Sequence, residues 1–352
     1  MSHEPASADV ARAKMKAPVA VAAARNAALR IAFGAVIGFL LAGRFDITLF
    51  FLPALLAAQL LWLLPRPPGL AQGAGLVFLM GALAWITLLI AGAFSGQPVA
   101  YLMMIGLLLF FGFLLDSAGK AMPATLLLIL GSTLPLVVAQ SDTGAAGIAG
   151  ALVGAMAIAL LSVWIAFALF PTDAGVAAAA PAIRPASPRE AFINTMLLVP
   201  VLLVFLIDGR MTFVAVIVIV NIIRQRERGA ASLTALGLLF GNILGGVLAS
   251  IAYVFVSIQT GPVFFLLVVL LVGLTLAGRG VVAGPKAPIY SVAFVSFIIL
   301  LGLGVSPVPS ESAELFADRL MSVLAAGAYA VGAISLVSRR GTLPAAHEAS
   351  TA

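Results

Sequence analysis

The stretch LLAGRFDITLFF, residues 40–51, places Arg44 and Asp46 in a part of the chain that is otherwise almost wholly apolar. A second stretch, FLIDGRMTFVAV at residues 205–216, has nearly the same pattern. In both, a Gly-Arg dipeptide follows a long apolar segment, and the arginines, Arg44 and Arg210, are 166 residues apart (210 − 44 = 166). This recurrence predicts a duplicated membrane unit. It also raises the question of whether the charges only mark a turn or take part in function.

The composition requires lipid as the main solvent of this chain. Of its 352 residues, 63% are hydrophobic and only 9% are charged, whereas a soluble domain needs about 25% charged residues to cover its surface. There are no cysteines, and the two histidines, His3 and His347, lie near the ends of the chain. We therefore expect no disulfide, metal site or cofactor. Neither a phosphate-binding glycine loop nor a hydrolase motif occurs, so no catalytic residue and no enzyme activity are predicted.

Twelve apolar segments have, or nearly have, the length of a membrane-spanning helix, which needs about 20 residues at 1.5 Å per residue. These segments are residues 27–42, 47–64, 74–94, 99–115, 121–139, 144–170, 191–207, 211–223, 232–257, 262–279, 286–305 and 314–337. The segment at 211–223 is short for a full crossing. The chain is therefore predicted to be an all-α integral membrane protein with about twelve transmembrane helices.

The distribution of positive charge predicts the orientation of these helices. If the N-terminus lies in the cytoplasm and the spans alternate, only Arg44, Arg210 and Arg319 of the 19 lysines and arginines fall on the outer side. Such a bias follows the positive-inside rule and places both termini in the cytoplasm. The net charge of +6 is then explained by the excess of Lys and Arg on the cytoplasmic side of the membrane, and no nucleic-acid partner is expected.

A stretch rich in Ala, Pro and Ser divides the spans into two sets of six and is predicted to be a cytoplasmic linker. Because six is an even number, both sets enter the membrane in the same direction, as parallel repeats do. In chain order, the predicted organisation is a cytoplasmic tail at 1–24, a first six-helix repeat at 25–170, the linker at 171–190, a second six-helix repeat at 191–338 and a cytoplasmic tail at 339–352.

A second pair of basic residues has the same separation as the two arginines. Lys120 and Lys286 are also 166 residues apart (286 − 120 = 166), and their surroundings, AGKAMP and AGPKAP, are alike. Between these anchors the offset slips, since GLVF at 75–78 matches GLLF at 237–240 with a separation of 162. Ionisable groups at membrane depth are costly and usually face protein or water. The candidate substrate-binding residues are therefore Arg44, Arg210, Lys120 and Lys286.

Coupling or supporting residues are expected near these cations. The acidic candidates are Asp46, Asp208 and Asp116, and the neutral candidate is Asn221, which lies in a span made mostly of Val and Ile. An alternative stays open for all the charges, because long basic side chains can reach water from the membrane interface without any role in transport. The basic loop RQRER at 224–228 is interpreted as an orientation anchor on anionic lipid rather than as a substrate site.

The duplicated unit resembles the fusaric-acid-resistance and aromatic-acid-exporter superfamily in its Gly-Arg turns at 43–44 and 209–210 and in the Ala/Gly/Lys/Pro starts of its fifth spans at 118–123 and 283–288. The likeness covers most of residues 25–338, in a compact form without a large cytoplasmic domain. It implies export of small organic, often aromatic, acids from a bacterial inner membrane, along a path lined by basic residues between two six-helix halves. It also implies a periplasmic adaptor of the membrane-fusion type as a partner, besides membrane lipid.

Two other functions remain open at this point. A secondary transporter of the major facilitator superfamily would also have six plus six helices, but the loops PRPPGLAQG and RQRERGA lack the Gly/Asp/Arg-rich signature of that superfamily. A membrane scaffold whose partner does the work would show no transport. A duplicated pair of basic residues in the membrane favours transport.

Overall fold

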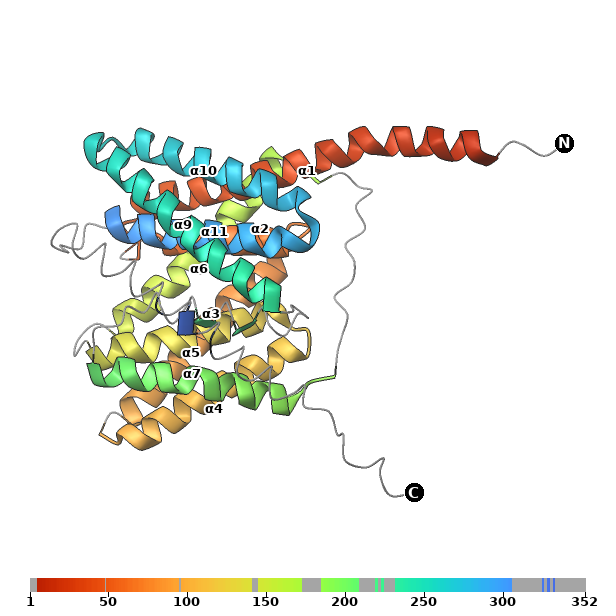
Figure 1. Cartoon of the computed structure of the whole chain (residues 1–352). Coiled ribbons are helices and arrows are strands. Elements are labelled where there is room, and N and C mark those ends of the chain that lie inside the picture. The colour runs from red at the N-terminus through yellow and green to blue at the C-terminus, as the bar shows by residue number, and fades with distance from the viewer. Residues whose placement is uncertain are drawn as a thin grey trace, which may run out of the picture. The chain divides into compact units, whose positions relative to one another are not determined.

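The computed structural model describes residues 5–47, 49–94, 96–140, 145–172, 185–208, 219–220, 223–224 and 232–305, together with residues 325, 328–329 and 332. Within these ranges the chain is helical and contains no strand (Figure 1). The prediction of an all-α protein is therefore confirmed for the part of the chain that the structure describes.

Ten α-helices and one short 3₁₀ helix are described. They are α1 (Pro5–Arg44), α2 (Leu52–Leu63), α3 (Leu70–Phe94), α4 (Pro98–Ser117), α5 (Ala121–Gln140), α6 (Ala145–Leu169), α7 (Pro188–Asp208), α9 (Ser232–Ile258), α10 (Pro262–Val282), η1 (Gly284–Lys286) and α11 (Ala287–Val305). Ten of the predicted spans coincide with these α-helices. The other two, 211–223 and 314–337, lie almost wholly outside the described residues.

Seven helices in the described ranges are long and apolar enough to cross a membrane. Two more apolar segments, Leu52–Leu63 and Ala121–Ser132, are shorter. Large apolar side chains are exposed in rows on several of these helices, four residues apart, as expected of a face that contacts lipid. On α4 the row consists of Val99, Met103, Leu107 and Phe111, and on α10 of Val263, Leu267 and Leu271.

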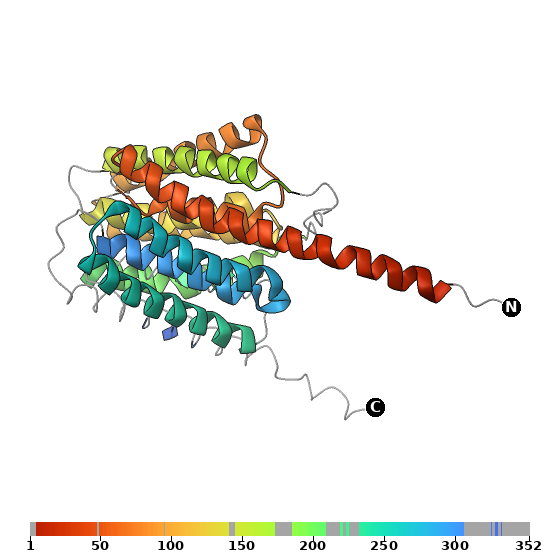
Figure 2. The ribbon, with the colours of Figure 1, turned by 90° about the horizontal axis from the view of Figure 1, so that it is seen from above.

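Helix α1 is longer than a membrane span. Its candidate span covers Val21–Arg44, but the helix begins at Pro5 and has 40 residues. At 1.5 Å per residue it is about 60 Å long, and its first part extends beyond α10 in both views (Figures 1 and 2). Most of the predicted N-terminal tail is therefore continuous with the first span.

The chain forms two compact units, each of which combines segments from distant parts of the sequence. The first unit consists of Met1–Ala82, Ala146–Pro181 and Ile243–Glu311. In it α1 packs on α2 and α10, and α11 packs on α10 and α2. Figure 2 shows α1 alongside α10.

Helices α1 and α10 run in opposite directions. Near one end Phe39 packs edge-on against Phe265 with ring centroids 5.0 Å apart. Further along, a side chain at Gly273 would press on Ala32. From the first contact to the second, the residue number decreases on α1 and increases on α10, so the two helices are antiparallel. Small residues at the contact allow this close approach.

The second unit consists of Leu83–Ala145, Ala182–Asn242 and Ser312–Ala352. In it α4 packs on α5 and α7, and α5 also contacts α7. The Tyr101 hydroxyl on α4 donates a hydrogen bond of 2.8 Å to the carbonyl oxygen of Pro135 on α5. Two of the boundaries between the units fall inside α3 and α9, so these two helices contribute residues to both units.

Candidate functional site

The candidate site lies in the second unit, where α4 ends and α5 begins. The Gly119 amide donates to the Asp116 carbonyl at 3.0 Å, and the Lys120 amide donates to the Leu115 carbonyl at 3.0 Å. Gly119 has a φ of 80°, a left-handed conformation that glycine adopts without steric cost. These two bonds form a Schellman motif, which ends α4 and turns the chain directly into α5. Asp116 is thereby fixed in the last turn of α4.

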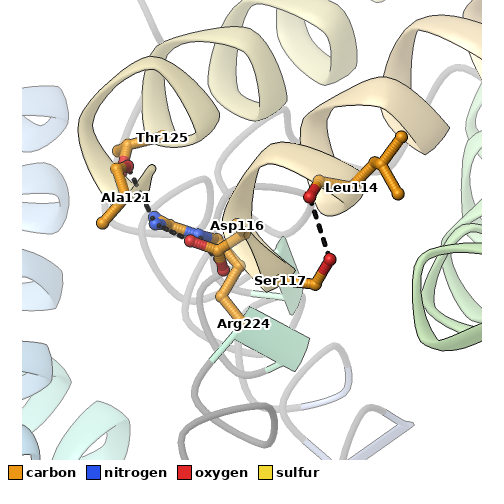
Figure 3. A network of polar contacts seen from close by, with 6 residues as sticks. All are labelled: Leu114, Asp116, Ser117, Ala121, Thr125 and Arg224. Atoms are coloured by element: carbon orange, nitrogen blue, oxygen red, sulfur yellow. Dashed lines mark hydrogen bonds and ion pairs between the residues drawn. The ribbon is translucent and has the colours of Figure 1, made fainter. Parts of the chain in front are cut away.

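The Asp116 carboxylate binds Arg224 through two parallel hydrogen bonds (Figure 3). Arg224 Nη2 donates to Oδ1 at 2.8 Å, and Nε donates to Oδ2 at 3.1 Å. Nη2 also donates to the Ala121 carbonyl oxygen in the first turn of α5 at 3.3 Å. Only 7% of the arginine side chain and 3% of the aspartate side chain are exposed. The planar guanidinium matches a carboxylate in a way that a lysine ammonium cannot.

The ion pair is a costly arrangement for a protein that needs only stability. Removing ions from water costs several kcal/mol for each, and the attraction between them often does no more than offset this. Asp116 lies in the last turn of α4, where the partial negative charge of the helix end disfavours a carboxylate. Ionisable groups in membrane helices usually mark substrate or ion pathways. The pair is therefore a candidate functional site.

Several polar groups surround the pair. The Ser117 hydroxyl donates to the Leu114 carbonyl at 2.9 Å and accepts a bond of 3.1 Å from the Ser187 amide, which precedes α7. Lys120 is exposed, as are Arg189 and Glu190 in the first turn of α7. The site therefore has a buried carboxylate-binding arginine, and an exposed lysine, Lys120, follows Asp116 closely in the sequence.

The structure places two predicted substrate-binding residues at opposite ends of the first unit. Arg44 is the last residue of α1, and Lys286 ends η1 after α10; both are exposed. Because α1 and α10 are antiparallel, these residues are separated by the length of α10, which is about 30 Å. They do not form one cluster. Asp46 is exposed in the turn after α1, with a φ of 47°.

The remaining predicted residues are less fully described. Lys120 belongs to the second unit and Lys286 to the first, and the substrate-binding role of the two lysines stays a prediction. Asp208 ends α7, but its side-chain environment lies outside the description. Arg210 and Asn221 lie outside the described residues, and their roles also stay predictions.

Arg224 is the residue of this candidate site that the sequence analysis does not predict. The interpretation of the RQRER loop as a lipid anchor is wrong for this residue, because its side chain is buried against Asp116. One signal was available. Asp116 is an acidic residue in an otherwise apolar helix, and such residues commonly pair with another ionisable group.

A second buried arginine provides a contrast. Arg30 on α1 donates from Nη1 to the carbonyl oxygens of Phe170 at 3.0 Å and Pro171 at 3.4 Å, just after the end of α6. Its guanidinium also lies 4.9 Å from the centre of the Phe167 ring. A cation at a helix C-terminus is favourable, so these contacts of Arg30 have a structural explanation that Asp116 lacks.

Long apolar helices joined by short turns, with rows of exposed apolar side chains, define a multi-pass membrane protein. Residues 27–169 match the model of a family described as "Protein of unknown function (DUF2955)". No curated protein and no solved structure matches the chain. Among the described residues, no group of three or more His, Cys, Asp or Glu side chains could hold a metal ion.

Proposed function

We propose that this protein exports small organic acids, in particular aromatic acids, across a bacterial inner membrane, with both termini in the cytoplasm. The observation that carries the proposal is the buried Asp116–Arg224 pair in an apolar helical protein. It is supported by the resemblance of the sequence to aromatic-acid exporters. A transporter of organic anions needs a cation that can bind a carboxylate away from bulk water, and Arg224 already does so.

The proposal includes two parallel six-helix repeats, and the packing supports them. If α1 corresponds to α7, α4 to α10 and α5 to α11, the contacts of α1 with α10 and of α10 with α11 in the first unit correspond to those of α7 with α4 and of α4 with α5 in the second. The glycines before the two lysines, Gly119 and Gly284, both have positive φ, at 80° and 55°. The family match at 27–169 also nearly coincides with the proposed first repeat.

The same contacts favour this proposal over a major-facilitator mechanism. In that mechanism one six-helix half rocks against the other around a central site, which requires each half to pack mainly with itself. Here α1 packs on α10 and α4 packs on α7, so both contacts join helices of different halves.

The proposed repeats also differ at one equivalent place. Trp62 near the end of α2 and Arg224 are 162 residues apart, the separation of the neighbouring GLVF and GLLF stretches. Trp62 packs against Gly280 near the end of α10, where a side chain would collide with the indole ring. Arg224 instead binds Asp116 near the end of α4. In the first unit an aromatic contact is enough to pack these two helices, so packing alone does not require an ion pair at this place in the repeat. This favours a functional role for the Asp116–Arg224 pair.

The other predicted basic residues complete the proposed path. Lys120 and Lys286 would draw anions from the cytoplasmic side, while Arg44 and Arg210 would provide positive potential at the outer side. Arg44 and Lys286 lie at opposite ends of the first unit, as this role requires. A periplasmic adaptor would receive the exported acid.

Transport by the purified full-length protein in liposomes tests the proposal. Efflux of labelled 4-hydroxybenzoate should exceed that of protein-free liposomes at mildly alkaline pH, where the carboxyl group is ionised. The variant Lys120→Gln/Lys286→Gln should insert normally but lose about 90% of the flux, because the attraction for anions is removed. If the unmodified protein shows no flux with any aromatic acid and co-purifies with another protein, the scaffold alternative replaces this proposal.

A further inference from the structure

We propose that Arg224 is the carboxylate-binding residue of the transport cycle, and that the Asp116 carboxylate occupies it until the carboxylate of an organic acid displaces it. This inference rests on the proposed function and names the binding group, its internal competitor and the accompanying proton. Asp116 takes up one proton from water when it leaves Arg224.

The first argument is chemical identity. Asp116 presents to Arg224 the same group that an organic acid carries, and both carboxylate oxygens are bound, at 2.8 and 3.1 Å. Two parallel N–H donors recognise the shape and charge of a carboxylate group and do not contact the rest of the molecule that carries it. A benzoate or hydroxybenzoate carboxylate can therefore make the same two bonds.

The second argument is the unequal support of the two partners. Arg224 has an additional acceptor in the Ala121 carbonyl oxygen at 3.3 Å, so the guanidinium retains a contact with α5 when Asp116 leaves. The same carbonyl accepts a bond of 2.6 Å from Thr125 Oγ1, which helps to hold this turn in place (Figure 3). Asp116, in contrast, is disfavoured by its position at the C-terminal end of α4. Displacement of the aspartate rather than movement of the arginine is therefore expected.

The third argument concerns the proton. A carboxylate left buried without its cation costs several kcal/mol, and a proton bound to one Asp116 oxygen removes that charge. The charged groups of the elements that pack against α4 include Lys120 before α5 and Arg189 and Glu190 at the start of α7, all exposed. Asp208, at the far end of α7, is also charged, and its side chain lies outside the description. Arg226, Glu227 and Arg228 follow Arg224 in sequence but lie outside the described residues. The exchange then couples the binding of one organic anion to the uptake of one proton.

Binding to the detergent-purified full-length protein tests this exchange, with benzoate as the probe and the uncharged benzamide as its control. Asp116→Asn imitates the protonated carboxyl group and removes the competitor, so it should bind benzoate about tenfold more tightly than the unmodified protein. Arg224→Gln should lose binding, and Arg224→Lys should bind at least tenfold more weakly than the unmodified protein, because a lysine offers no planar pair of donors. Glu190→Gln, which removes an exposed carboxylate, should behave as the unmodified protein does. Benzamide should bind to none of them.

Proton uptake gives a second readout that needs no variant. When benzoate is added in weakly buffered solution at matched pH, the unmodified protein should take up about one proton from the solution for each benzoate bound. Asp116→Asn should take up none. A purely structural ion pair predicts neither this uptake nor tighter binding by Asp116→Asn.

Three results would overturn the exchange. They are benzoate binding without proton uptake, undiminished binding by Arg224→Gln, and absence of benzoate binding from the unmodified protein and Asp116→Asn alike. The liposome experiment decides separately on the proposed function, since 4-hydroxybenzoate efflux that persists in Arg224→Gln would support export and reject this site.

Discussion

At the scale of single residues, burial separates cations that have the same appearance in the sequence. Arg224 and Arg30 are buried, with 6% and 8% of each residue exposed, whereas Arg44, Lys120 and Lys286 are exposed. All five lie near the ends of apolar segments. The difference lies in the partners, which are 108 residues away for Arg224 and 140 for Arg30.

Replacement of Arg30 should lower stability without affecting the binding of anions. Arg30→Gln removes the charge-assisted bonds to the carbonyl oxygens after α6, and such bonds contribute about 1.5–3 kcal/mol. Thermal unfolding in detergent should show a lower midpoint, while the affinity of the protein for benzoate stays the same. Arg25→Gln, at an exposed position on the same helix, serves as the control and should leave the midpoint unchanged. A drop in benzoate affinity with Arg30→Gln would place Arg30 in the site instead.

At the scale of elements, the turns before the fifth span of each proposed repeat hold the basic residues in place. Gly119 and Gly284 both adopt the left-handed conformation, and the turn at Gly119 also positions Asp116. The sequence interpretation identified these stretches from their similarity. It could not show that the glycines share a backbone conformation, because glycine also occurs where helices pack closely.

Substitution at Gly119 should destabilise the end of α4. Because left-handed backbone costs a residue with a side chain roughly 1–2 kcal/mol, Gly119→Ala should lower the unfolding midpoint. Gly119→Asn should do less harm, since asparagine tolerates this conformation. Gly75→Ala, within α3 and with open space around it, is the matched control and should lose no stability. Equal effects of alanine at the two positions would contradict the proposed strain.

Most helices could be predicted from the sequence, because apolar length is a local property. The continuation of α1 back to Pro5 could not, since residues 5–20 are polar enough to be interpreted as a tail. The contacts between helices were also beyond prediction. Helix faces made of Ala, Gly and Leu resemble one another, and nothing in α1 itself distinguishes α10 from other helices as its partner.

At the scale of the whole molecule, the two compact units do not correspond to the two predicted halves of the sequence. Each unit takes helices from both sides of the 171–190 linker. Expression of residues 1–180 and 181–352 as separate chains tests whether these contacts determine folding. Neither fragment should resist protease alone, because α1 then lacks α10 and α7 lacks α4. Co-expression should restore resistance and copurification. A resistant first fragment would show that this half folds independently.

The packing of α1 on α10 also means that α1 is synthesised long before its partner helix is available. Helix α1 is complete at Arg44, but α11, the last helix of its unit among the described residues, ends at Val305. Ribosomes add about 5–20 residues per second, so the helix spends roughly 10–50 s in the membrane before its unit can close. During this interval the small-residue face of α1 contacts lipid or a helper protein instead of α10. A newly made chain is thus most vulnerable to misassembly and degradation while its second half is still on the ribosome.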